Sequence, residues 1–147
     1  MSDPTVIHGL LAGLAATGAM TLLEIVARSR WGLEGLLEWQ ENQTVAAWIT
    51  KGAMEDAVVP GLGFHFLHGL LAGIVFVLVL PLFPSMVPLW VLGPGYGVVL
   101  FAITLVIHGP ITGRSAWAGP RGSIALALSL LSHMVYGAAL ALLVVWP

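Results

Sequence analysis

GLGFHFLHGLLAGIVFVLVLPLF, residues 61–83, contains no Asp, Glu, Lys or Arg. An α-helix of this length, at roughly 1.5 Å of rise per residue, crosses a hydrocarbon core about 30 Å thick. Because lipid offers no water to unpaired backbone groups, such a run has to form a helix with internal hydrogen bonds. The stretch therefore predicts a membrane-spanning helix over residues 62–83, with Pro60 and Gly61 expected to break the chain before it.

Three further segments of the chain, residues 6–27, 86–108 and 122–146, have the same apolar character. The 147 residues are 59% hydrophobic and only 8% charged, whereas a soluble domain carries about 25% charged residues. The sequence therefore predicts an all-α, polytopic membrane protein, a single domain of four transmembrane helices. The lipid bilayer is its first expected partner. Nucleic acid is excluded, because the few basic residues form no run or stripe.

The basic residues predict the orientation in the membrane. All five Lys and Arg residues lie between the first and second spans or between the third and fourth. Cytoplasmic loops of membrane proteins are enriched in these residues. The pattern predicts a multi-pass protein of the cell (cytoplasmic) membrane with cytoplasmic loops 28–61 and 109–121 and both termini on the outer face. Trp31 and Trp117 agree, since they fall at the expected inner interface.

The long first loop has an organisation of its own. Apolar residues recur at helical spacing around Leu36 and around Trp48. They predict a short amphipathic segment of two helices, over residues 31–56, lying in the membrane interface. The first of these helices carries an acidic stripe of three glutamates, Glu34, Glu38 and Glu41. The stripe is either a solvated face or a docking site for a basic partner.

Small residues recur in every span and share a face with its ionisable group. In the first span, Gly9, Gly13 and Glu24 form one stripe at about 100° per residue. Small residues allow helices to approach closely in lipid, where no hydrophobic drive acts between them. The positions expected at helix contacts are Gly9, Gly13, Gly69, Gly73, Gly97 and Gly137. Gly95-Tyr96-Gly97 also matches part of a potassium filter, but a proline-kinked helix explains it better.

Ionisable groups inside the spans mark functional sites by default. The candidate polar cluster consists of Glu24, His65, His68, His108, His133 and Tyr136. A metal ion could take ligands from Glu24, His65, His68 and His108, and haem b could take His133 with His65 or His68. The favoured interpretation has no cofactor, with each group bonded to a neighbouring helix. No catalytic motif is present in the loops, so enzymatic activity is not expected.

The sequence contains a short internal repeat and also resembles a class of other membrane proteins. His65-xxx-Gly69 recurs as His133-xxx-Gly137, each in the second helix of an expected hairpin, which indicates a hairpin duplication. With its Gly- and Ala-rich first span, amphipathic loop, GFHFLHG at 63–69 and HMVYG at 133–137, the chain resembles a class of small four-helix bacterial and archaeal membrane proteins with no assigned activity. The resemblance implies the fold only.

Three functional hypotheses follow from these patterns. The first is an accessory or structural subunit of a larger membrane complex, such as a respiratory or photosynthetic one, with other integral membrane subunits as partners. Its motive is a second set of small residues on the first span, Gly9, Ala12, Ala16 and Ala19, which exceeds what three neighbouring helices need. The alternatives are a small oligomeric transporter or channel, and a haem- or metal-binding redox protein.

Overall fold

The computed structural model describes residues 5–31, 37–84, 86–108 and 122–145, and these form helices and short turns without a strand. The long helices are α1 (Val6–Trp31), α3 (Val58–Val79), α4 (Leu89–Ile103) and α6 (Gly122–Val144). Each of them, alone or with an adjoining turn, is long and apolar enough to cross a membrane. The prediction of an all-α protein with four transmembrane helices is confirmed.

The helix boundaries differ from the predicted ones near the prolines. A one-turn helix, η1 (Glu55–Ala57), leads directly into α3, so the helical segment begins well before residue 62. The predicted break at Pro60 was wrong, because this proline lies in the first turn of α3, where a missing N–H costs no hydrogen bond. Pro88 has an extended conformation and delays the start of α4. After α3, the short η2 (Leu80–Leu82) completes the second span.

The first loop contains one helix rather than two in its described part, α2 (Leu37–Thr50), which packs against α3. Trp48 and Ile49 are exposed on it. Glu41 is only 3% exposed, so the prediction that it belongs to an exposed acidic stripe was wrong: this face of α2 turns toward the bundle. Glu34 and the side chain of Glu38 lie outside the described residues.

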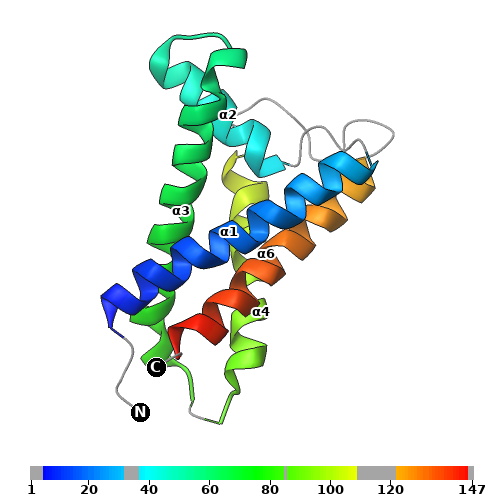
Figure 1. The fold of residues 1–147 in the computed structure, drawn as a ribbon. Coiled ribbons are helices and arrows are strands. Elements are labelled where there is room, and N and C mark those ends of the chain that lie inside the picture. Colours follow the sequence, from blue (N-terminus) through cyan, green and yellow to red (C-terminus); the bar gives the residue numbers. More distant parts are fainter. Residues whose placement is uncertain (1–4, 32–36, 85, 109–121, 146–147) are drawn as a thin grey trace.

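The chain passes up and down through the bundle four times (Figure 1). Helices α1 and α3 form one hairpin, α4 and α6 the other, and α1 packs against α6 to join them. The α3–α4 connection lies at the same end as the two chain ends, and α2 lies at the opposite end (Figure 1). We call these the terminal end and the α2 end.

Each hairpin is held by backbone contact at glycine. A Cβ added at Gly9 would lie 2.6 Å from the carbonyl oxygen of Gly73, and one at Gly13 would lie 2.6 Å from that of Gly69. In the second hairpin, added Cβ atoms at Gly97 and at Gly137 would likewise collide with the backbone of the facing helix. These distances leave no room for a side chain, so the helices pack through their backbones.

Three of the four residues in the second small set of α1 are buried inside the bundle, and the fourth, Ala19, is half-buried. Ala12 and Ala16 are buried in an apolar cluster between the hairpins that includes Phe76, Leu140 and Val144. Gly9 faces α3. Helix α1 therefore has two close neighbours, α3 and α6, and its small residues do not require a partner protein.

Helix α4 runs through Pro94 without interruption up to Ile103. It is followed by a π-helix, η3 (Thr104–His108). Gly95, Tyr96 and Gly97 are helical, so their carbonyl groups run along the helix axis and do not form an ion filter.

Candidate functional site

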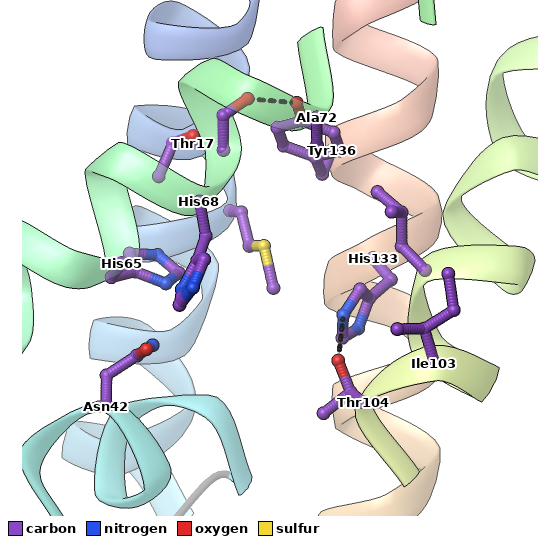
Figure 2. Close-up of a pocket in the computed structure, with 12 residues that line it drawn as sticks. Thr17, Asn42, His65, His68, Ala72, Ile103, Thr104, His133 and Tyr136 are labelled. Atoms are coloured by element: carbon purple, nitrogen blue, oxygen red, sulfur yellow. Dashed lines mark hydrogen bonds between the residues drawn. The ribbon is translucent and has the colours of Figure 1, made fainter. Parts of the chain in front are cut away.

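A pocket of about 210 Å³ separates α3 from α4 on the side of Tyr96 that faces the α2 end. At Tyr96 itself the two helices touch, because its hydroxyl donates to the carbonyl oxygen of Ala72 at 2.8 Å and its ring lies 5.1 Å from that of Phe76. Residues from α1, α2, α3, α4 and α6 line the pocket. Its polar side chains include Asn42, His65, His68, Thr104, His133 and Tyr136, most of which appear in Figure 2.

Four of the six members of the predicted polar cluster meet in this pocket: His65, His68, His133 and Tyr136. Glu24 is buried, at 3% exposed, but does not line it. Its burial keeps the carboxylate away from lipid, as expected for an ionisable group inside a span. The side chain of His108 lies outside the described residues.

His65 is fixed by a threonine of the facing helix. Its Nε2 lies 3.1 Å from Oγ1 of Thr21. The hydroxyl of Thr21 donates its own hydrogen to the carbonyl oxygen of Thr17 at 2.8 Å. Since a hydroxyl has only one hydrogen, Thr21 accepts from the ring and His65 carries its proton on Nε2.

His133 makes the corresponding contact with a threonine in the second hairpin, but there the direction of the hydrogen bond is reversed. Its Nδ1 lies 2.8 Å from the carbonyl oxygen of Ser129, which can only accept, so the proton is on Nδ1. Its Nε2 lies 3.3 Å from Oγ1 of Thr104 and, in the neutral ring, accepts from that hydroxyl (Figure 2). Thr104 begins the π-helix η3, and such local widening is frequent at functional sites.

The remaining polar groups differ in exposure. Asn42 of α2 is 5% exposed and lines the pocket. It points toward the rings of His65 and His68 (Figure 2). His68 is exposed although it lines the pocket, so the pocket opens to the outside of the bundle at this residue.

Tyr136 closes the pocket toward the terminal end. Its hydroxyl donates to the carbonyl oxygen of Gly69 at 2.5 Å, across the gap between the two hairpins. Gly69 is also the place where Thr17 meets α3, since an added Cβ there would collide with the threonine hydroxyl. Glycine at this position therefore serves both the α1–α3 contact and the wall of the pocket.

Sequence reasoning missed Asn42 and Thr104. Asn42 lies in a loop that hydropathy places outside the membrane, and only the packing of α2 on α3 brings it to the pocket. Thr104 was not identified, because nothing in the residue pattern indicates the π-helix that begins at this residue.

The geometry argues against the haem hypothesis and does not assemble a metal site from the described residues. Both ring nitrogens of His133 are engaged in hydrogen bonds, and a pocket of 210 Å³ is too small for a porphyrin. Within residues 5–31, 37–84, 86–108 and 122–145, no three His, Cys, Asp or Glu side chains are grouped closely enough to hold a metal ion.

Comparisons with protein-family models, curated proteins and solved structures gave no match for the chain. The resemblance to small four-helix membrane proteins therefore stays a prediction. A function has to be argued from the pocket and the two hairpins themselves.

Proposed function

We propose that the protein is a small membrane transporter that binds a small polar solute between its two hairpins. The observation that carries the proposal is the pocket itself, a mainly apolar cavity on which the polar groups of Asn42, His65, His68 and His133 converge, among helices that are otherwise apolar. Polar groups inside a membrane are costly and mark pathways for solutes, ions or protons. A volume of about 210 Å³ fits a solute of a few heavy atoms.

The pocket is closed on one side and open on the other, as expected for one state of a transporter. Toward the terminal end it meets the apolar cluster around Phe76 and Leu140, where Tyr96 ties α4 to α3. The opening of the pocket lies at the exposed His68 of α3.

The two hairpins are the natural moving bodies. Each is held together by backbone contacts at glycine, whereas α3 and α4 meet through side chains at Tyr96. In transporters built from repeats, one bundle rocks against the other around a fixed site near the middle of the membrane. Opening the Tyr96 contact while α1 and α6 close further would expose the pocket to the opposite side.

Solute flux into proteoliposomes tests the proposal. The purified chain is expected to accelerate the uptake of at least one small polar solute, and Asn42→Leu is expected to lower the rate roughly tenfold or more, because it fills the pocket with an apolar group. His8→Gln is the matched control, since His8 lies exposed near the terminal end, bonds Thr5 and does not line the pocket. Flux that is unchanged by Asn42→Leu would contradict the proposal.

A role as a subunit of a larger complex has one supporting observation. His68 is exposed on a membrane-spanning helix, and a neighbouring subunit over the opening would shield it from lipid. Purification in mild detergent separates the two functions. The transporter proposal expects a monodisperse chain without other polypeptides, whereas a stoichiometric foreign membrane protein would favour the subunit.

A further inference from the structure

The carbonyl groups around the pocket are already covered by side chains of the protein. Tyr136 donates to Gly69 at 2.5 Å and Tyr96 donates to Ala72 at 2.8 Å. Thr17 donates to the carbonyl one turn earlier in α1. Cation sites inside membranes are built from carbonyl and carboxylate oxygens. These carbonyl oxygens therefore already accept hydrogen bonds from side chains of the protein and are poorly placed to bind a cation.

The pocket also lacks carboxylates in its described lining, which contains no Asp, Glu, Lys or Arg. Glu24 of α1 and Glu41 of α2 are buried in the bundle but do not line the pocket, and neither is without a partner. A cation entering the pocket would meet no carboxylate in its described lining. This is an unfavourable environment for a cation in a medium of low dielectric constant.

Hydrogen-bond donors are what the pocket offers. Asn42 is only 5% exposed, and its amide points into the pocket (Figure 2). His65 and His68 are one helical turn apart on α3, and both rings are drawn next to that amide (Figure 2). When protonated, an imidazole carries a positive charge and donates from both nitrogens.

We infer that the pocket binds a small anion, held by the amide of Asn42 and by the imidazole pair His65 and His68, and that the anion enters together with a proton. The inference rests on the proposed function, since it names the class of solute. The proton resides on an imidazole while the anion is bound, so the occupied site carries no net charge. A neutral ion pair is far less costly inside the bundle than an isolated anion.

The groups that set the pH dependence can be named from each helix around the pocket. From α3 they are His65 and His68, and from α6 they are His133 and Tyr136. The lining residues of α1, α2 and α4 add no titratable group. Both ring nitrogens of His133 already make hydrogen bonds, so the imidazole pair on α3 is the expected proton carrier.

Calorimetry on the full chain in nanodiscs, with acetate as the probe, tests the inference. Acetate is expected to bind roughly tenfold more tightly at about pH 5.5 than at about pH 7.5, with uptake of about one proton, because histidine titrates between them. Proton uptake is read from the heats in two buffers of different ionisation enthalpy. Asn42→Asp places a carboxylate in the same space and is expected to weaken acetate binding roughly a hundredfold, and His68→Gln roughly tenfold. His8→Gln is expected to leave it unchanged.

Two matched probes separate this inference from the proposed function. Acetamide has the shape of acetate without its charge, and methylammonium is a small cation. Tighter binding of acetamide or methylammonium than of acetate, or unaltered acetate binding by a folded Asn42→Asp variant, would overturn the anion inference and leave a solute pocket in place. Failure of all three probes to bind, with no flux in proteoliposomes, would overturn the inference and the proposed function together.

Discussion

The two hairpins of this protein are built on the same plan. In each, glycines four residues apart on the first helix face the second helix, and a threonine of the first helix meets a histidine of the second. The glycine contacts differ in register, since Gly13 faces Gly69 whereas Gly97 faces the backbone of His133. The threonine–histidine contacts, Thr21 with His65 and Thr104 with His133, are equivalent. This equivalence supports the hypothesis of a duplicated hairpin, with both copies running in the same direction through the membrane.

The pocket exists because the copies differ. The residue three positions after the equivalent histidine is His68 in the first hairpin and Tyr136 in the second. The tyrosine reaches across to Gly69 and is buried, whereas His68 is exposed at the pocket opening. Helix α2, which is inserted within the first hairpin, adds Asn42. The glycine and threonine–histidine contacts that both hairpins share, which we call the shared frame, thus make each hairpin rigid. The differences between the copies supply the polar groups of the pocket.

The largest effect is expected where both hairpins are the same. Gly69→Leu and Gly97→Leu place a side chain against the facing helix, so each is expected to destabilise the fold by about 3 kcal/mol or more. Gly63→Leu and Gly95→Leu are the controls on the same two helices, because an added Cβ there meets nothing within 4 Å. Unfolding in mixed micelles measures the difference, and equal tolerance of the tight and open positions would contradict the shared frame.

The sequence predicts this frame well and the pocket only in part. Hydropathy alone marks the four spans, because a span has to be apolar along its whole length. It does not tell which helices are neighbours, so Ala12 and Ala16 pointed to a partner protein although α6 covers them. His65, His68 and His133 were identifiable as intramembrane ionisable groups, whereas Asn42 depends on how α2 folds back onto α3.

A smaller effect is expected at the tyrosines that join the hairpins. Tyr136→Phe removes the bond to Gly69 and is expected to cost about 1 kcal/mol of stability. Tyr96→Phe is expected to cost less, because Tyr96 is only half-buried whereas Tyr136 is buried. The same unfolding assay measures both variants. A larger loss for Tyr96→Phe would show that the contact between α3 and α4 depends on the other tyrosine.

Making the copies more alike is expected to close the pocket with little effect on the fold. His68→Tyr gives the first hairpin the residue found at the equivalent position of the second. Because His68 is exposed, the change is expected to alter stability by less than about 0.5 kcal/mol. The bulkier ring should fill the pocket opening and abolish acetate binding by calorimetry. Retained binding in a folded variant would show that the solute does not pass this residue.

The smallest expected effect involves no change in stability. It is a difference between the two hairpins in which ring nitrogen of the histidine carries the proton. The two threonine–histidine bonds look alike, but the hydroxyl of Thr21 donates its only hydrogen to the carbonyl oxygen of Thr17. The ring of His65 therefore has to donate to Thr21. His133 donates to Ser129 from the other nitrogen, so its Nε2 accepts from Thr104. Nitrogen-15 spectra of histidine-labelled protein above neutral pH should therefore show His65 protonated on Nε2 and His133 on Nδ1.

Assignment of these signals uses His65→Gln and His133→Asn. Glutamine places an amide N–H near the Nε2 position of His65, and asparagine places one near the Nδ1 position of His133, so each keeps the donor that its site requires. Thr21→Val removes the acceptor of His65 and leaves His133 untouched. It is expected to shift only the His65 signals, whereas Thr104→Val is expected to shift only those of His133. The same tautomer in both rings would mean that the two hairpins share their hydrogen-bond chemistry as well as their frame, and that the asymmetry of the pocket comes from His68, Tyr136 and α2 alone.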